Sequence, residues 1–210
     1  MPIDSPEATS DRDAVIMAPL GTDQKLRIGA YTLAASLLRS APDQTMLDYL
    51  IEAGRDTDGR DDIAIAMAAM AEAAATTTPA KAGDEFHDLF IGVGRGELVP
   101  FGSWYLTGFL MEKPLSLLRT DLAQLGFERQ PAVSEPEDHA AALAEVMAML
   151  ISDAAEHDTQ QQFYDKHLSS WMLRFFTDLQ QAKSASFYRT VGQFGVAFIK
   201  LENRYFSMQL

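Results

Sequence analysis

The apolar residues of this chain recur at the spacing of an α-helix along most of its length. A clear case is the run Leu143, Val146, Met147, Leu150 and Ile151, which follows an i, i+3, i+4, i+7, i+8 pattern. No segment alternates apolar and polar residues as a half-buried strand does. The spacing therefore predicts an all-α fold, a helical bundle of two closely packed subdomains.

Proline and glycine mark where the expected helices begin and end, because proline is tolerated in a first helical turn and glycine commonly follows a last one. In the first half of the chain we expect four helices: one from Asp23, with Leu26, Ala30, Leu33, Ala34 and Leu37, that Pro42 stops; a short one with Met46, Leu47, Leu50 and Ile51 that Gly54 ends; one from Ile63 to Ala75; and one opened by Pro79 that carries Phe86, Leu89 and Phe90. In the second half we expect four more: one opened by Pro114, with Leu115, Leu118, Leu122 and Leu125, that Gly126 ends; one introduced by Ser134 and Glu137; one with Phe163, His167, Trp171, Phe175 and Leu179; and one with Phe187, Val191, Phe194, Phe198 and Leu201. The aromatic residues Phe175, Phe176, Phe194 and Phe198 are expected to lie in the core.

Composition shifts along the chain predict its domain organisation. Residues 1–20 hold three prolines among acidic and hydroxyl residues and are expected to form a loose, acidic, disordered tail. Residues 126–137 hold two prolines and few apolar residues, which is typical of a linker. We therefore expect an N-terminal helical subdomain over 21–130 and a C-terminal one over 131–210.

Charge and cysteine content exclude several classes of function. With 17 Lys and Arg against 30 Asp and Glu, the net charge of −13 disfavours binding to nucleic acid and favours a basic partner, although acidity also serves solubility alone. No Cys is present, which excludes disulfides and thiolate sites. The acidic start does not resemble a secretion signal and no apolar run reaches 18 residues, so we expect a cytoplasmic protein without membrane insertion.

The stretch from Asp84 to Tyr105 combines glycines, a proline and aromatic residues in a way that neither helix nor strand spacing explains. Gly92, Gly94 and Gly96 predict a shaped loop after a helix end, and their spacing lacks the Lys and Ser or Thr of a phosphate-binding loop. Pro100 precedes Phe101, Gly102, Ser103, Trp104 and Tyr105. Aromatic residues beside a loop either fill a core or line a groove, and both interpretations stay open here.

Few residues suggest catalysis or metal binding. The cluster Glu135, Pro136, Glu137, Asp138 and His139 fits either an acid/base pair or an acidic first helical turn that the helix dipole favours. The four histidines, His87, His139, His157 and His167, form no zinc-binding helical pair, so no metal site is expected. His157 and His167 are expected at surface or partly buried positions, and Ser103 lacks the flanking glycines of a nucleophile elbow.

Two separated motifs, DLFIGVGRGELVPFGSWY at 88–105 and EPEDH at 135–139, together resemble the TorD/DmsD/NarJ family of redox enzyme maturation chaperones. The resemblance extends from about Tyr31 to Leu201 and includes FYDKHLSSWMLRFF, which is similar to the family signature Phe-x-x-x-His-Leu-x-x-Trp. Val93 is a departure, because the family often has proline between the glycines of the loop.

This resemblance implies an all-helical chaperone with no catalytic activity and no cofactor of its own. Its partners would be the twin-arginine leader and the folded body of a molybdenum-containing oxidoreductase, which it would hold until the client's cofactor is inserted. It also implies either a monomer or a domain-swapped homodimer. The implied leader-binding residues are Leu89, Phe90, Pro100, Phe101, Ser103, Trp104, Pro136, Asp138 and His139.

Physical chemistry is consistent with this implication, because a leader that joins a basic segment to an apolar one needs an aromatic groove with carboxylates at its rim. The alternative is a helical enzyme of the hydrolase class that uses Asp138 and His139 as an acid/base pair.

Overall fold

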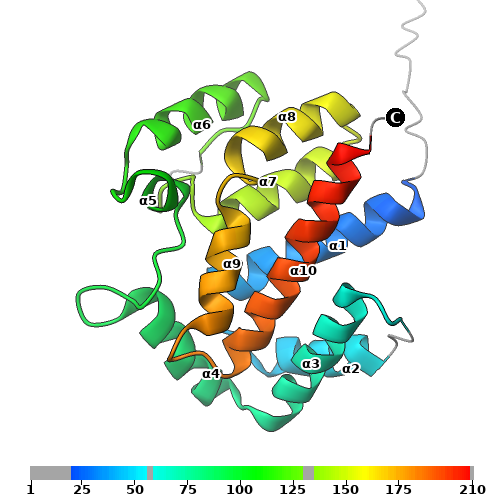
Figure 1. Cartoon of the computed structure of the whole chain (residues 1–210), viewed down its shortest axis with the longest axis vertical. Helices are drawn as coiled ribbons and strands as arrows, with labels where there is room; N and C mark the ends of the chain where they lie inside the picture. The colour runs from blue at the N-terminus through cyan, green and yellow to red at the C-terminus, as the bar shows by residue number, and fades with distance from the viewer. Residues whose placement is uncertain (1–19, 56–58, 130–134, 209–210) are drawn as a thin grey trace, which may run out of the picture.

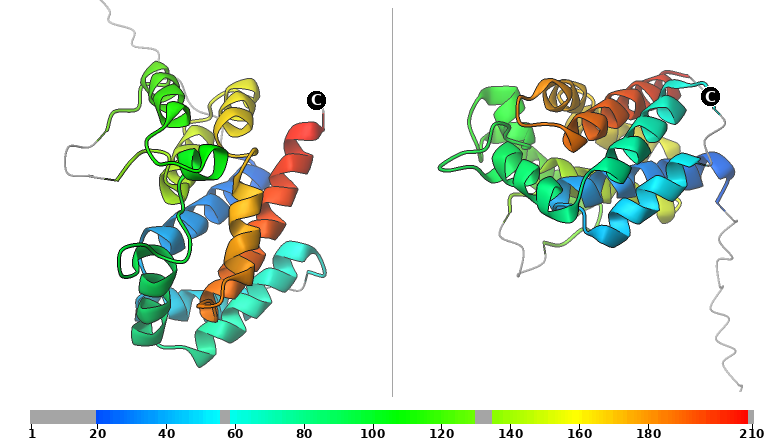
Figure 2. Two further views of the ribbon diagram at one scale, coloured as in Figure 1. Left: turned by 60° about the vertical axis from the view of Figure 1, so that its left-hand side comes forward. Right: turned by 90° about the horizontal axis from the view of Figure 1, so that it is seen from below.

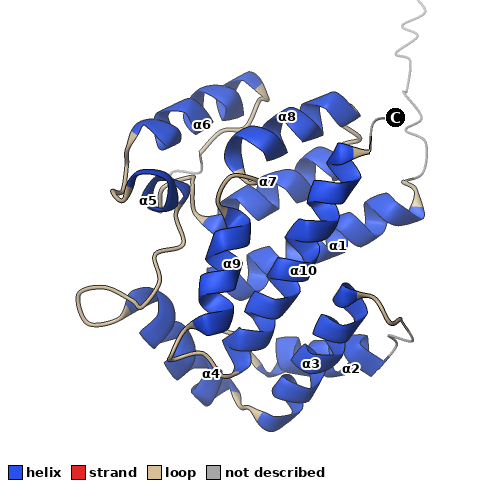
Figure 3. Ribbon diagram, in the orientation of Figure 1, coloured by secondary structure: helices blue, strands red, loops and turns tan. Residues whose placement is uncertain are grey.

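The computed structural model describes residues 20–55, 59–129 and 135–208, and within these ranges it consists of helices joined by loops, without a β-strand (Figures 1 and 3). The predicted all-α class is therefore confirmed, while nearly all of the predicted tail lies outside the described residues. The helices are α1 (Thr22–Arg39), α2 (Gln44–Arg55), α3 (Asp62–Thr76), α4 (Pro79–Phe86), the π-helix η1 (His87–Ile91), α5 (Gly102–Thr107), α6 (Lys113–Gln124), α7 (Ala140–Ser152), α8 (His157–His167), α9 (Met172–Gln181) and α10 (Phe187–Ser207).

Helix starts follow local sequence signals. The Asp61 side chain accepts a hydrogen bond from the backbone N–H of Ala64 and caps α3, and the Thr78 hydroxyl caps α4 in the same way, immediately before Pro79. Pro114 lies in the first turn of α6, where it displaces no helical hydrogen bond. The predicted helices that begin at Ile63, Pro79 and Pro114 are thus confirmed.

The longest helix, α10, runs through the middle of the molecule and packs against α9 on one side and α3 on another (Figures 1 and 2). The first helix, α1, packs mainly against α7, and α2 packs against α3. Four phenylalanines predicted to be core residues, Phe175, Phe176, Phe194 and Phe198, are buried as expected. Helices from both sides of the predicted linker therefore pack together closely, and the subdomain boundary stays a prediction.

A buried ion pair joins the beginning of the fold to its end. The Arg27 guanidinium on α1 donates hydrogen bonds of 2.7 and 2.8 Å to the two carboxylate oxygens of Glu202 on α10, and a third bond to Gln160 on α8. The Tyr31 hydroxyl also donates to Glu202, at 2.7 Å. The Arg27 guanidinium additionally lies over the ring of Tyr205, 4.0 Å from its centroid. Every hydrogen-bonding group at this junction has a partner, as burial of charges requires.

This ion pair explains two wrong expectations about burial. Leu26 and Leu201 belong to predicted apolar faces, yet both are exposed. In each case the adjacent charged residue, Arg27 or Glu202, is the one that is buried. Because successive helix residues point about 100° apart, burying the charged pair turns both leucines toward solvent.

The helix predicted through Phe163, Trp171 and Leu179 is in fact two helices, α8 and α9, joined by a turn over residues 168–171. A continued α-helix would direct the backbone N–H of Trp171 to the His167 carbonyl. Instead the indole Nε1–H of Trp171 donates to that carbonyl at 2.7 Å, and its backbone N–H bonds to Leu168. The spacing of apolar residues does not reveal that the indole N–H of Trp171 takes the carbonyl that its backbone N–H would bind in a continuous helix.

Within the described ranges, no single helix is both long and apolar enough to span a bilayer, although α3 and the Pro79–Ile91 helical segment pass that test as a pair bent by 114°.

Candidate functional site

Helix α4 continues into η1, which ends at Ile91, and the predicted loop begins at Gly92. Gly92 has a φ of 59°, which non-glycine residues rarely adopt. Gly96 has no room for a side chain, because an added Cβ would lie 2.5 Å from the Leu89 carbonyl oxygen. Backbone hydrogen bonds from Glu97 to Asp88 and from Leu98 to Leu89 then close the loop. The glycines therefore shape this loop, as the sequence predicted.

Leu89 and Phe90 lie on the inner side of the loop. Leu89 is completely buried, and the half-buried Phe90 ring packs edge-on against Tyr188 of α10, with 5.6 Å between centroids. Leu89 is therefore a core residue.

The second half of the loop is attached directly to the segment before α7. Phe101 and His139 form an isolated antiparallel β-bridge, and their rings meet edge to face at 5.0 Å. The backbone N–H of Ala140 donates to Pro100, and that of Gly102 donates to the Asp138 carbonyl. The two motifs singled out in the sequence are therefore in contact in the folded chain.

One interpretation of the sequence placed Asp138 in the first turn of a helix, and the structure shows that this is wrong. Helix α7 begins at Ala140, and its N-cap is His139, whose Nδ1 accepts a hydrogen bond of 3.1 Å from Ala141. The Asp138 carboxylate instead accepts a 2.7 Å bond from the backbone N–H of Ser103, in the first turn of α5. Each segment thus supplies acceptors to the start of the other segment's helix. Ser134, the predicted start of the capping box, lies outside the described residues.

Two buried polar atoms at this junction make no hydrogen bond. They are Oδ1 of Asp138 and Oγ of Ser103, and the Asp138 side chain is only 3% exposed. Among the described residues, no Lys, Arg or His forms an ion pair with Asp138. A buried carboxylate without a cationic partner is costly, so this one is a strong candidate for binding a donor from a ligand.

Asp138 lies in the wall of a cavity of about 370 Å³ between α5, α6, α7 and the α8–α9 turn. The cavity is lined by Gly102, Leu106, Pro114, Leu117, Leu118, Asp121, Asp138, Leu143, Lys166, His167 and Trp171. Most of these side chains are apolar, which suits a peptide ligand that combines apolar groups with a cation. We refer to this space as the Asp138 cavity.

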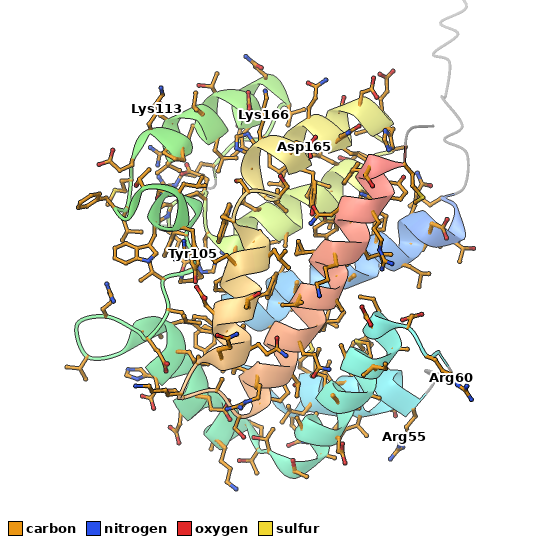
Figure 4. All side chains as sticks on the ribbon, in the orientation of Figure 1. Arg55, Arg60, Tyr105, Lys113, Asp165 and Lys166 are labelled. Carbon is orange, nitrogen blue, oxygen red and sulfur yellow. The ribbon has the colours of Figure 1, made fainter. Side chains whose placement is uncertain are left out.

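The other charged groups of the Asp138 cavity balance one another. Asp121 on α6 accepts bonds from two residues of α8, Nε2 of His167 at 2.8 Å and Lys166 at 3.3 Å. Figure 4 labels Lys166 on α8. Burial acts to raise the pKa of Asp121, but these two partners outweigh it and hold the pKa below its usual value. His167 is buried, at 9% exposed, instead of lying at a surface or partly buried position, whereas His157 is partly buried as expected.

Trp104 and Pro136 face other parts of the surface. Trp104 lies under the Arg95 guanidinium, 4.9 Å from the ring centroid, in a separate cavity of about 460 Å³ that Tyr105 also lines. Pro136 lines a third cavity of about 580 Å³ near Arg39. The nine predicted site residues are therefore divided among the core, the contact between the two motifs and three cavities. The cavity residues Lys166, His167 and Leu106 were absent from the prediction, because only tertiary contacts bring them to Asp138.

The acid/base interpretation of Asp138 and His139 has little geometric support. Burial, together with the charge of Arg39, lowers the pKa of His139 to about 4. Its Nδ1 is occupied by the helix cap, and the Asp138 carboxylate bonds to Ser103. In the part of the chain that the structure describes, no group of three or more His, Asp or Glu residues could hold a metal ion.

The helices and the contact between the two motifs define an all-α protein whose candidate site lies where the two motifs meet. The chain belongs to the nitrate reductase delta subunit family, whose model matches residues 57–177. This membership confirms the family resemblance seen in the sequence.

Curated relatives are chaperone proteins named TorD. The TorD of Vibrio atlanticus (strain LGP32) is 27% identical over 135 residues, which are 59% of this chain and 63% of the relative. The TorD of Vibrio cholerae serotype O1 (strain El Tor Inaba N16961) is 29% identical over 127 residues, which are 55% of this chain and 58% of the relative. The chain thus matches about six tenths of the length of these relatives.

A crystal structure gives a match over most of the fold. It is that of a candidate redox enzyme maturation protein from Archaeoglobus fulgidus, with a TM-score of 0.53, 19% identity, and coverage of 90% of this chain and 98% of the other. At this identity the likeness concerns the fold alone.

Proposed function

We propose that this protein is a redox enzyme maturation chaperone that binds the twin-arginine leader of a molybdenum-containing oxidoreductase. It holds the client in the cytoplasm until the client's cofactor is inserted, and the leader and the folded body are its two binding partners. Residues at the contact between the two motifs, Asp138 above all, receive the leader. A monomer and a domain-swapped homodimer both remain predictions for its assembly.

The observation that carries this proposal is the buried Asp138 carboxylate oxygen without a partner, next to the unpartnered Ser103 hydroxyl. A guanidinium group presents several N–H donors in one plane, and hydrogen bonds between charged groups are about twice as strong as neutral ones. The apolar lining of the Asp138 cavity suits the rest of such a leader. The net charge of −13 further favours the approach of a basic peptide.

The alternative, a hydrolase with Asp138 and His139 as its acid and base, is less well supported. The relatives are named as chaperones, and the imidazole of His139 is committed to a helix cap. A panel of ester, phosphoester and nucleotide substrates tests the alternative directly, and turnover that His139→Asn abolishes would establish it.

The test of the proposal is calorimetric titration with a synthetic twin-arginine leader from an oxidoreductase. We expect about one leader per chain, and an affinity that falls as ionic strength rises from low to physiological values, because salt screens the attraction between the acidic protein and the basic peptide. Absence of binding to leaders of this class would contradict the proposed function.

Asp138→Asn tests the site. Asparagine keeps an acceptor for the Ser103 N–H but removes the charge, so leader affinity should fall by about ten- to a hundredfold. Asp158→Asn is the matched control, because it makes the same change in net charge at an exposed position on α8 and should leave affinity within about twofold. Equal affinities for all three proteins would refute the role of Asp138 while leaving the chaperone function in place.

A further inference from the structure

The end of α5, its connection to α6 and the first part of α6 carry a set of exposed apolar side chains. Its members are Leu106, Phe109, Leu110, Met111 and Leu117, and we call them the apolar ledge. Phe109 is 68% exposed and Met111 is 73% exposed. Single exposed apolar residues are ordinary, but several within a dozen residues of chain mark a surface that binds something.

The backbone holds the apolar ledge in a defined shape. The N–H of Gly108, which has a left-handed φ of 83°, donates to the Trp104 carbonyl. The Thr107 hydroxyl donates to Ser103 at 2.8 Å and accepts from the N–H of Phe109 at 3.2 Å. Met111 has a φ of 58°, a left-handed conformation that is unfavourable for a residue with a side chain. These features place large apolar side chains in solvent at an energetic cost to the free protein.

The apolar ledge is continuous with the Asp138 cavity, because Leu106 and Leu117 belong to both. Within the cavity, the charge of Asp121 is already balanced by Lys166, and Nε2 of His167 lies 2.8 Å from the same carboxylate oxygen. Asp138 is the cavity carboxylate without a cationic partner among the described residues. An apolar surface therefore adjoins a single unbalanced negative charge.

This arrangement matches a peptide in which an arginine is followed by an apolar segment. We propose that the apolar ledge binds the apolar segment of the leader while a preceding arginine reaches Asp138 in the cavity. The inference rests on the proposed function and adds a second contact surface, outside the two motifs that suggested the site. It also explains why the α5–α6 connection retains exposed apolar residues.

Phe109→Gln tests this inference, with Leu110→Gln as a second variant in case one substitution disturbs the turn. Leu26→Gln on α1 is the matched control, because Leu26 is also 68% exposed and lies outside the ledge. Each protein is titrated with two peptides, an intact twin-arginine leader and the same leader with its apolar segment replaced by serine and glycine. Circular dichroism verifies that each variant keeps its helical content.

We expect Phe109→Gln to weaken binding of the intact leader by about tenfold, because the variant loses the apolar area that Phe109 would bury against the leader. Binding of the serine and glycine peptide should be unchanged. Leu26→Gln should bind both peptides as the wild type does. Leu110→Gln should follow Phe109→Gln.

The other outcomes overturn the inference in distinguishable ways. If the wild type binds the intact leader and the ledge variants bind it equally well, the inference fails and the proposed function stands. If the wild type binds no leader, both fail. If the ledge variants abolish self-association in sedimentation experiments without changing leader affinity, the ledge binds a second copy of the chain instead.

Discussion

At the scale of single residues, His139 makes stability depend on pH. Its pKa is lowered from 6.5 to about 4, first by burial and then by the charge of Arg39. Below pH 6.5 the unfolded chain gains a proton that the folded chain does not accept until about pH 4. The free energy of unfolding should therefore fall as the pH is lowered through this window, by roughly 2 kcal/mol between pH 7 and pH 5 from this residue alone.

Urea unfolding of the wild type and of His139→Asn at pH 7 and pH 5 measures this contribution. Asparagine is a good helix N-cap and does not titrate, so the variant should lose less stability on acidification. His167, whose pKa is also lowered by burial, is present in both proteins and cancels in the comparison. Equal loss in the two proteins would show that His139 titrates normally in the folded state.

At the scale of elements, α9 and α10 approach closely because α10 has glycine at two facing positions. A Cβ added at Gly192 would lie 2.5 Å from the backbone nitrogen of Gln180 and 2.9 Å from the Phe176 carbonyl oxygen. Backbone atoms cannot move aside as a flexible side chain can. Gly192→Ala should therefore destabilise the protein by about 1 to 3 kcal/mol, although alanine is the better helix former.

Gly29→Ala on α1 is the control for that measurement. Nothing lies within 4 Å of a Cβ at Gly29, so alanine there should raise stability by up to about 1 kcal/mol. Chemical denaturation of both variants gives the two signs. A stabilised Gly192→Ala would mean that α9 and α10 can separate without loss.

At the scale of the whole molecule, the buried Arg27–Glu202 pair connects α1 and α10, and Gln160 adds α8. Glu202→Gln would leave the buried Arg27 charge without a counter-charge, and we expect a loss of about 3 kcal/mol or more in the free energy of unfolding. Glu145→Gln, which removes an ion pair that Arg39 forms at the surface, should cost less than about 1 kcal/mol. Similar losses in denaturant titrations of the two variants would contradict a special role for the buried pair.

The sequence alone predicted the helical class and the helices that begin at Ile63, Pro79 and Pro114, because apolar spacing, prolines and capping residues act within a few neighbouring residues. It also identified both motifs of the candidate site and, through them, the family. Where a long-range contact competes with local spacing, sequence reasoning was wrong. The break between α8 and α9 depends on the Trp171 indole, and the exposure of Leu26 depends on an ion pair with a residue at the other end of the chain.

Only the tertiary structure decided what Asp138 contacts and which residues share its cavity. Asp138 accepts a hydrogen bond from the N–H of Ser103, which is 35 positions away in the sequence. Lys166 and His167 line the same cavity from a later helix, α8. Burial and partner are properties of segments brought together by folding, and no local pattern encodes them. The order of side chains along the chain therefore determined the helices and the motifs, whereas packing between distant segments determined which buried carboxylate of the described residues has no cationic partner.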